Sequence, residues 1–362
     1  MKITRLRTVV VHVPLPKPAL AAIFELRAVD CVLVFLETDQ GLVGEGLVMT
    51  VNGRRLAVLH EMVRSMEPLV VGLDPRMGGS VARRARSELN FFGEAGLSMM
   101  GLAGVDMALF DLRAKIAGLN VAAMMGASRP AVPAYASGGL WLSASTDALQ
   151  AEAAAFLAQG FRAMKLRLGK PDPAEDVARV RAVREAVGPA VALMADANQQ
   201  MTVPQAIRLG RMLEEFNLTW FEEPVHYLNH DGEAAIAAAL DTPIASGETE
   251  YTARGMLTML QRRSADILMP DLQRMGGPTE FLKAAQVADV FDTPVSSHLY
   301  SEMSLPLMAT LPNALYLEHM PWFEPLYTEH VELDAAGDAI VPERPGWGFA
   351  FNHDAIVRLA VS

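Results

Sequence analysis

Ionisable residues recur at near-regular intervals in the second half of the chain. From Lys165 the steps are 31, 26, 26, 23, 27 and 20 residues, which lead to Asp196, Glu222, Glu248, Asp271, His298 and Glu318. Each of them sits at the end of a short apolar run with the pattern of a strand. A step of this size is about one strand plus one helix, so the spacing predicts one such side chain per βα unit. If the strand ends converge on one rim, all seven side chains meet in one small volume.

Three consecutive positions in this series are carboxylates, Asp196, Glu222 and Glu248. Gathered at one rim they would repel one another unless a cation neutralised them. Ligation by carboxylate oxygens suits a hard metal, Mg²⁺ above all. The alternative is that each carboxylate caps the helix after its strand, but three in register favour the metal. Asn198 lies on the same face as Asp196 and could bind metal-linked water or substrate, whereas Glu223 is predicted to point away from Glu222 and to support the site from behind.

Asp271 and His298 fall on the next two predicted strands. A carboxylate beside an imidazole orients its tautomer and raises its basicity, which is the arrangement of a general base. The alternative for a single buried histidine is a structural role. His226 and His230, four residues apart, could suggest zinc, but a nearby proline and asparagine argue against the helix that such a pair needs, and no third ligand is evident.

Two cations, Lys165 and Arg167, lie within the strand-like stretch FRAMKLRLGK. Two positions apart on a strand, they point to the same face. A guanidinium is almost never neutral at pH 7, so Arg167 is handicapped as a proton acceptor but suited to hold a carboxylate or hydroxyl. We therefore expect Arg167 to act as a clamp and Lys165 as an electrostatic partner.

The elements that must position these residues alternate regularly from Pro133 onward. Strand-like runs such as AMKLRLG and VALMADAN are each followed by helix-like runs such as PAEDVARVRAVREAV. About seven such units within about 190 residues indicate a barrel of the TIM type. The first part of the chain instead combines the strand-like runs ITRLRTVVVHV and DCVLVFLETDQGLVGEGLV with a helical stretch that ends at Gly118, which predicts a small α+β domain. Between those runs, PLPKPALAAIFELRAV reads as a mobile loop.

Composition restricts the class of protein. The 362 residues are 51% hydrophobic and 20% charged, with a formal net charge of −11, so a large core is expected and nucleic acid or an anionic membrane surface is not expected as a partner. The single cysteine, Cys31, cannot form an intrachain disulfide. The first apolar run is interrupted too early for a secretory signal, and no run is long enough for a membrane span. We expect a cytoplasmic protein that acts on a small molecule.

The segments MKLRLG, ADANQ, WFEEP, SGE, MPDLQRMGG, SSHLYSEMS and YLEHM, in this order and spacing, resemble the enolase superfamily and its mandelate racemase subgroup. The resemblance implies an α/β fold: a modified TIM barrel, (β/α)7β, over 128–325, an N-terminal α+β capping domain over 1–127, and a C-terminal segment, 326–362, that returns to the cap. It implies one Mg²⁺ on Asp196, Glu222 and Glu248. It further implies a homo-oligomer, often an octamer.

The resemblance also implies a reaction. In this family a carboxylate substrate loses its α-proton to give an enediolate, here with His298 and Asp271 as the base dyad, Lys165 neutralising charge on the substrate carboxylate and Glu318 as a hydrogen-bonding electrophile. In mandelate racemase the strand pattern is Lys-x-Lys and the second lysine is a base, but here that position is Arg167. Racemisation needs a base on each face, whereas dehydration can proceed with one.

The leading hypothesis is therefore an acid-sugar dehydratase that converts a 2,3-dihydroxy acid to a 2-keto-3-deoxy acid. A racemase or epimerase of a 2-hydroxy acid is the alternative, favoured by the chain length and by the apolar loop PALAAIFELRAV. A lactone cycloisomerase is a third possibility. A non-enzymatic barrel, with Arg167 marking lost chemistry, would leave the retained carboxylates and dyad unexplained, because unpaired buried charges are costly.

Substrate identity is expected to lie in the capping loops, about residues 14 to 30 and 48 to 56, because loops carry specificity while the barrel carries chemistry. The candidates in these loops are Phe24, Arg27, Met49 and Asn52. At the first barrel strand they are Tyr135, Ser137 and Trp141. The alternative for all of them is ordinary packing of the cap against the barrel.

Overall fold

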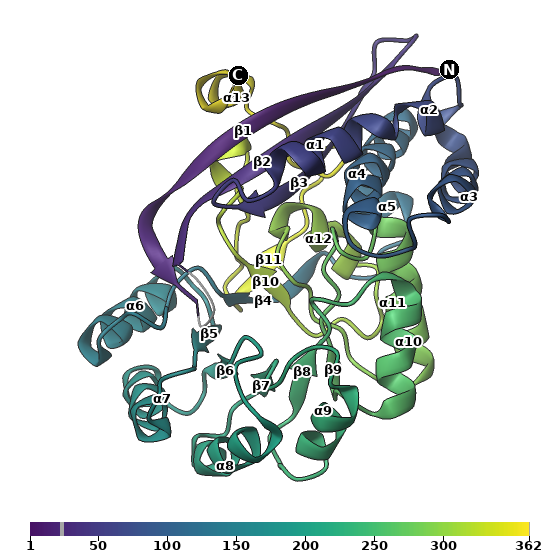
Figure 1. Ribbon diagram of the computed structural model, residues 1–362. Helices are drawn as coiled ribbons and strands as arrows, with labels where there is room; N and C mark the ends of the chain where they lie inside the picture. Colours follow the sequence, from purple (N-terminus) through teal and green to yellow (C-terminus); the bar gives the residue numbers. More distant parts are fainter. Residues whose placement is uncertain (22–24, 362) are drawn as a thin grey trace.

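The computed structural model describes residues 1–21 and 25–361. An antiparallel sheet at the N-terminus lies over one end of a curled parallel sheet (Figure 1). The antiparallel sheet consists of β1 (Ile3–Leu20), β2 (Glu25–Thr38) and β3 (Val43–Val51), in that order. The prediction of a mobile loop over residues 14–29 is wrong at both ends, because β1 continues to Leu20 and β2 begins at Glu25. As an edge strand β1 tolerates prolines, and its pairing shifts register between Pro14 and Ala19.

Helices follow this sheet along the chain. They are α1 (Leu56–Ser65), α2 (Glu67–Val70), α3 (Gly78–Leu89), α4 (Leu97–Ala117) and α5 (Val121–Met124), with a 3-10 turn, η1 (Pro75–Met77). The sheet is contacted by α1, α2 and α4, whereas α3 and α5 pack against α4. The long α4 crosses β3 closely, because a Cβ atom added at Gly44 or Gly46 would lie 2.2 or 2.3 Å from a carbonyl oxygen of α4. These two glycines are two positions apart and therefore face the same helix. Below, "cap" denotes β1–β3 with α1–α5.

The parallel strands form a closed barrel. Neighbouring strands pair in the order β4 (Ala131–Ala136), β5 (Ala163–Arg167), β6 (Ala192–Asp196), β7 (Trp220–Glu222), β8 (Ile244–Ser246) and β9 (Ile267–Leu268), and β10 (Leu317–His319) pairs with β4. Residues 295–298 fill the remaining position through the bridges Leu268–Val295, Asp271–His298 and Val295–Ala314. The barrel therefore has eight strand positions.

One helix follows each of the first seven strand positions. These helices are α6 (Thr146–Ala158), α7 (Pro173–Val187), α8 (Val203–Leu213), α9 (His230–Ala237), α10 (Thr252–Arg262), α11 (Pro278–Val290) and α12 (Ser301–Met308), and the turn η2 (Glu214–Phe216) follows α8. The predicted modified TIM barrel, (β/α)7β, is thus confirmed. None of the helices in the described part of the chain is long and apolar enough to cross a membrane.

The chain then returns from the barrel to the cap. After η3 (Glu324–Leu326), β11 (Asp338–Ile340) pairs antiparallel with β4, and α13 (His353–Leu359) lies beside β1 (Figure 1). The Trp347 ring stacks on Phe110 of α4 with centroids 6.4 Å apart, and the amide of Val361 donates to the carbonyl of Val10. The domain boundaries at 127 and 325 remain a prediction.

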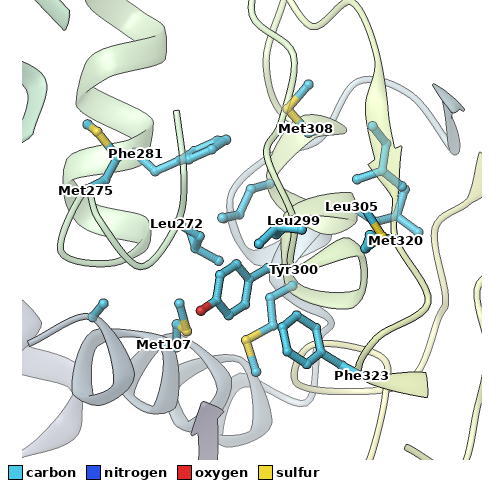
Figure 2. Close-up of a cluster of buried hydrophobic side chains, with 14 of the residues drawn as sticks. Met107, Leu272, Met275, Phe281, Leu299, Tyr300, Leu305, Met308, Met320 and Phe323 are labelled. Atoms are coloured by element: carbon cyan, nitrogen blue, oxygen red, sulfur yellow. The ribbon is translucent and has the colours of Figure 1, made fainter. Parts of the chain in front are cut away.

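Apolar side chains hold the cap on the barrel. Figure 2 shows Met107 of α4 facing Leu272 and Tyr300 of the barrel loops, with the Tyr300 ring stacked on Phe323 at 5.1 Å. A second cluster, around Tyr135 and Trp220, fills the barrel interior. The rim between these two clusters carries the polar residues.

Candidate active site

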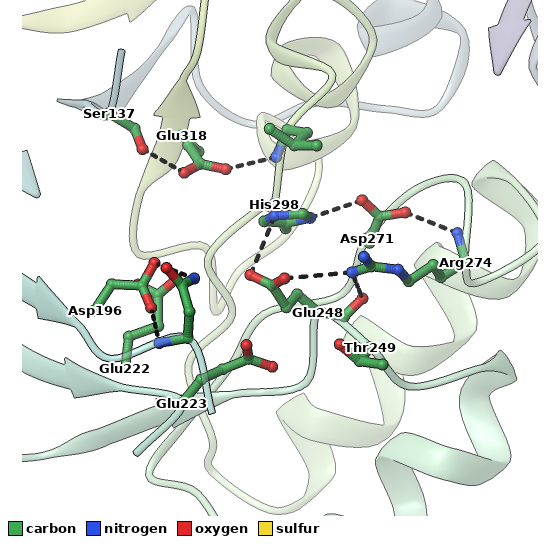
Figure 3. A network of polar contacts seen from close by, with 12 residues as sticks. Ser137, Asp196, Glu222, Glu223, Glu248, Thr249, Asp271, Arg274, His298 and Glu318 are labelled. Atoms are coloured by element: carbon green, nitrogen blue, oxygen red, sulfur yellow. Dashed lines mark hydrogen bonds and ion pairs between the residues drawn. The ribbon is translucent and has the colours of Figure 1, made fainter. Parts of the chain in front are cut away.

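The ionisable side chains predicted to meet at the strand ends do gather at one rim. Figure 3 shows Asp196, Glu222, Glu248, Asp271, His298 and Glu318 there. Lys165 and Arg167 lie on β5, Asp196 and Glu222 end β6 and β7, and Glu318 lies on β10. Glu248 follows β8, and Asp271 follows β9. His298 ends the segment 295–298, which fills the strand position after β9. This convergence follows from the parallel arrangement of the strands, which brings every carboxyl end to the same side.

The Lys165 ammonium lies at the centre of the carboxylates. Its Nζ is 2.6 Å from Glu222 Oε1, 3.0 Å from Glu318 Oε1 and 3.7 Å from Asp196 Oδ2. Burial lowers the pKa of Lys165, but Glu222 and Glu318 outweigh burial and raise the pKa above its ordinary value. Lys165 thus adds a buried positive charge to the carboxylate cluster, and its role as an electrostatic partner remains a prediction.

Glu222 is fully buried beside this charge. Its Oε2 accepts from Trp220 Nε1 at 2.8 Å. Burial raises the pKa of Glu222 to about 7; Lys165 opposes this shift, and the neighbouring carboxylates, Asp196 among them, add to it. The acidic cluster thus holds more negative charge than Lys165 neutralises.

A divalent cation fits this surplus of negative charge. No three His, Cys, Asp or Glu side chains in residues 1–21 and 25–361 are already arranged as a metal-binding group. The reason is visible in the contacts: Glu222 turns to Lys165, and Glu248 Oε2 lies 3.1 Å from His298 Nε2. The donor chemistry of Asp196, Glu222 and Glu248 nevertheless suits Mg²⁺, since all three offer buried or half-buried carboxylate oxygens.

His298 and Asp271 form a hydrogen-bonded dyad. The 2.7 Å contact of His298 Nδ1 with Asp271 Oδ2 directs the other nitrogen, Nε2, toward Glu248 (Figure 3). Burial lowers the pKa of His298, but Glu248, the Asp271 hydrogen bond and Glu318 together raise it to about 9. The geometry is that of an imidazole whose tautomer is fixed by a carboxylate.

Arg167 lies across the rim from this dyad. Its guanidinium lies 4.7 Å from the centre of the Trp141 ring, donates to Ser137 Oγ at 3.1 Å and lies 3.4 Å from Asp196 Oδ2. Its Nη1 is buried without a partner among the described residues. One donor is thus available to an added ligand, while the others fix the side chain.

Glu318 accepts hydrogen bonds at both oxygens. Ser137 Oγ donates to Oε1 at 2.6 Å, and the amide of Leu299 donates to Oε2 at 2.7 Å. Burial raises the pKa of Glu318, but Lys165 and His298 outweigh burial and hold the pKa well below its usual range. A role as a hydrogen-bonding electrophile therefore requires Glu318 to gain a proton, and this role remains a prediction.

A cavity of about 320 Å³ lies between the rim and the cap. Of the predicted site residues, it is lined by Met49, Trp141, Lys165, Arg167, Asp196, Asn198, Glu248, Asp271, His298 and Glu318. The backbone and side-chain amides of Asn198 donate to Asp196 at 2.8 and 3.0 Å, which fixes that carboxylate.

Several predicted substrate-binding residues lie elsewhere. Tyr135 is buried in the barrel interior, with the centre of its ring 5.5 Å from Lys165 Nζ, and Ser137 holds Arg167 and Glu318 from behind. Arg27 is exposed and pairs with Glu25 at 2.9 Å. Asn52 bonds the backbone of residues 25 to 28 and thereby ties the end of β3 to β2. Phe24 lies outside the described residues.

Sequence reasoning missed two residues of the rim, Gln273 and Arg274, which both line the cavity. Arg274 Nη1 donates to the Glu248 carbonyl at 2.7 Å, and its amide donates to Asp271 Oδ1 at 2.7 Å. The sequence signal that could have identified them is their position, two and three residues after Asp271 at the end of a strand. Glu223 lies behind the rim as expected, where Gln199 Nε2 donates to both of its oxygens at 2.9 Å.

Comparison with known proteins identifies the family. The model of the mandelate racemase and muconate lactonizing enzyme N-terminal domain matches residues 4–126, and that of the enolase C-terminal-like domain matches residues 148–355. The chain belongs to the enolase superfamily, in its mandelate racemase subgroup. The resemblance read from the sequence motifs is thereby confirmed.

Relatives in this superfamily carry out several reactions. An L-talarate/galactarate dehydratase of Salmonella typhimurium is 38% identical over 73% of this chain and 66% of its own length. A 3,6-anhydro-α-L-galactonate cycloisomerase of Streptomyces coelicolor is 31% identical over 99% of both chains. The crystal structure of L-talarate dehydratase from Polaromonas sp. JS666, complexed with Mg and L-glucarate, superposes with a TM-score of 0.94 at 35% identity, over 100% of this chain and 98% of that one.

Further solved relatives also contain magnesium. The expectation of a superfamily enzyme with Mg²⁺ as its cofactor is therefore confirmed.

Proposed function

We propose that this protein is a Mg²⁺-dependent acid-sugar dehydratase that converts a 2,3-dihydroxy acid to a 2-keto-3-deoxy acid. The observation that carries the proposal is the asymmetry of the rim. One side offers the His298–Asp271 dyad, and the other offers Arg167, which cannot readily accept a proton. A rim with one base suits elimination and not racemisation. Relatives named as talarate and galactarate dehydratases support the proposal.

Asp196, Glu222 and Glu248 would hold the Mg²⁺. When bound, the metal supplies positive charge beside the substrate carboxylate and so makes the α-proton more acidic. Lys165 adds a second, permanent positive charge next to the same carboxylate, and Asn198 keeps Asp196 oriented.

The side chains of the dyad and the clamp carry the proton transfers. His298 Nε2 removes the proton from C2, while Asp271 holds Nδ1–H and stabilises the imidazolium. The electron pair left at C2 forms the C2–C3 double bond as the C3–O bond breaks. The imidazolium returns its proton to the departing hydroxyl, which leaves as water, and the enol then tautomerises to the 2-keto acid. Arg167 Nη1 donates to a substrate oxygen and fixes its orientation.

Racemisation or epimerisation of a 2-hydroxy acid is the second candidate. It is favoured by the apolar walls of the cavity, which include Leu26, Val51 and Trp322. Cycloisomerisation of a lactone is supported by the Streptomyces coelicolor relative.

Proton NMR in D₂O with Mg²⁺ separates these reactions across a panel of sugar acids. Dehydration gives a keto acid whose C3 carries its original proton and one deuterium from the solvent. Exchange of the α-proton for deuterium without elimination would overturn the dehydratase proposal in favour of the racemase.

The metal assignment has its own test. Calorimetric titration with Mg²⁺ should show one site per chain in the wild type and at least tenfold weaker binding in Asp196→Asn and Glu222→Gln. Asp172→Asn, on the exposed N-cap of α7, is the matched control and should bind Mg²⁺ like the wild type. Unchanged binding in both site variants would contradict the assignment.

We also propose that the protein is a cytoplasmic homo-oligomer acting on a small carboxylate. Support for association comes from Phe91 and Phe92, which are 92% and 70% exposed. Exposed aromatic side chains of this kind are enriched in protein interfaces. Light scattering on the eluting protein measures the assembly, and a monomer at micromolar concentration would contradict it.

A further inference from the structure

The wall of the cavity has two chemically different parts. The rim described above supplies the charged side chains. The other part is apolar and is built by both parts of the chain: Ala21, Leu26 and Val51 come from the cap, and Trp141, Met320 and Trp322 from the barrel loops. It begins directly beside the rim, because the Trp141 ring lies against the Arg167 guanidinium. We call these six residues the apolar roof. Val51, Trp141 and Trp322 pack against the small cluster that contains Ala21 and Leu26, so these five residues form a continuous surface, and Met320 lines the cavity with them.

Few polar groups outside the rim are available to a substrate. Among the described residues that line the cavity outside the rim, Thr50 Oγ1 is buried without a partner and Arg54 contributes a guanidinium. Gln273 and Tyr300 also line the cavity, but their polar atoms bond one another and the backbone of Met49. A hydroxyl that leaves water without gaining a new hydrogen bond is strongly disfavoured. A tail with a hydroxyl on every carbon would therefore lose more partners than the apolar part of the cavity can replace.

We propose that the substrate carries an apolar tail, an alkyl or deoxygenated chain beyond C3, which packs against the apolar roof while C1 to C3 lie at the charged rim. This inference rests on the proposed function for the recognition of C1 to C3 and names the substrate class more closely. A distal carboxylate, which Arg54 would have to bind, is the competing substrate class.

Binding tests the inference without turnover when the base is removed. Calorimetry on the Mg²⁺-loaded His298→Asn variant compares 2-hydroxyhexanoate with gluconate, two 2-hydroxy acids of six carbons that differ in the tail. We expect 2-hydroxyhexanoate to bind at least tenfold more tightly. In the series lactate, 2-hydroxybutanoate and 2-hydroxyhexanoate, affinity should rise about fourfold per methylene, as expected for apolar burial. Equal or tighter binding of gluconate, a flat series, or no binding of 2-hydroxyhexanoate would overturn the inference.

A substitution in the apolar roof tests whether the roof causes this difference in affinity. Val51→Thr keeps the shape and adds a hydroxyl, so the affinity ratio of 2-hydroxyhexanoate to gluconate should fall about three- to tenfold. Val43→Thr makes the same change at the other end of β3, away from the cavity, and should leave the ratio unchanged. A loss of stability alone would weaken the binding of both ligands by the same factor and leave the ratio unchanged. An unchanged ratio in Val51→Thr would therefore contradict the proposal that the apolar roof binds the tail.

Turnover distinguishes this inference from the proposed function. Three acids of one configuration, 6-deoxygalactonate, galactonate and galactarate, end in a methyl, a hydroxymethyl and a carboxylate group. Dehydration ranked in that order supports both proposals, and dehydration led by galactarate overturns the apolar tail while the dehydratase stands. If no acid is dehydrated, the proposed function fails, and the binding comparison still decides the nature of the tail.

Discussion

Arg167 determines which proton transfers the rim supports. Its guanidinium is held on three sides by Trp141, Ser137 and Asp196. A guanidinium is in general a poor proton acceptor. A lysine at the same position would place a compact ammonium group there, and the pKa of a lysine shifts readily when it is buried. The single change Arg167→Lys would therefore convert a rim that has one base, His298, into a rim that has a base on each face of the substrate.

We expect Arg167→Lys to add epimerising activity. A lysine that becomes neutral in this buried position can take the α-proton from the face opposite His298, so deuterium should enter C2 of the unreacted acid and its epimer should appear. Proton NMR in D₂O measures both. Arg184→Lys, which alters an arginine bonded to backbone carbonyls far from the cavity, should show neither. Intact dehydration without any epimer in Arg167→Lys would refute this explanation of specificity.

Asp271 should control the pH at which His298 acts as a base. Glu248 and the hydrogen bond that His298 Nδ1 donates to Asp271 help to raise the pKa of His298 to about 9, and a raised pKa means that the neutral, basic form appears only at higher pH. Asp271→Asn should therefore move the acidic limb of kcat/KM to lower pH and reduce the maximal rate by about 10²-fold. A pH–rate profile measures both effects. A lower rate with an unmoved limb would indicate a structural role for Asp271.

At the scale of elements, one side chain ties the cap to the catalytic rim. Gln273 Oε1 accepts from the Met49 amide at 2.6 Å and from the Tyr300 hydroxyl, and its Nε2 donates to the Met49 carbonyl at 3.2 Å. The side-chain amide thus pairs with β3 as a neighbouring strand would. Gln273 follows Asp271 by two residues, and Tyr300 follows His298 by two. The position of the cap is consequently coupled to both members of the dyad.

Gln273→Ala should raise KM more than it lowers kcat, because the cap forms one wall of the cavity while the dyad stays intact. We expect a five- to twentyfold rise in KM, with a loss of unfolding free energy of about 1–3 kcal/mol from the unpaired Met49 groups. Asn313→Ala removes an amide that bonds two backbone carbonyls away from the cavity. It should lower stability similarly without a change in KM, and equal KM effects in the two variants would argue against the coupling.

The sequence predicts what depends on periodicity and misses what depends on long-range contacts. Regular spacing from Lys165 to Glu318 was enough to predict the barrel and its rim, because parallel strands bring their ends together whatever the details of packing. Tyr135 was predicted to contact substrate, but alternation along β4 turns it into the barrel interior. The link between Gln273 and Met49 joins residues 224 apart and has no local pattern that could reveal it. Pro14 suggested a loop, but an edge strand accommodates it.

At the scale of the whole molecule, the barrel, the cap and the C-terminal return meet around buried polar groups. Glu302, at the start of α12, is 2% exposed, and its Oε2 has no partner among the described residues. Tyr327, in the returning segment, is buried with its hydroxyl unpaired within the same described part, and both burial and Glu302 raise its pKa. This junction therefore contains an acid that is more stable protonated than ionised.

Glu302→Gln should stabilise the protein increasingly as the pH rises. Burial raises the pKa of Glu302 from 4.5 to about 8. Below pH 4.5 the Glu302 carboxyl is protonated in both the folded and the unfolded chain. Between pH 4.5 and about pH 8 only the unfolded chain loses this proton, so the unfolding free energy of the wild type falls as the pH rises. The fall is complete above about pH 8. Glutamine removes this slope. The gain over the wild type should grow between pH 5 and pH 9 to a few kcal/mol, since one pKa unit corresponds to about 1.4 kcal/mol.

Urea unfolding of the variant and the wild type at pH 5 and pH 9 measures this difference. Glu332→Gln, at an exposed position, is the matched control and should show the same small effect at both pH values. A gain for Glu302→Gln that is equal at pH 5 and pH 9 would mean that the carboxylate is compensated in the folded state. The protonated acid at the junction would then not limit the stability of the assembled cap and barrel.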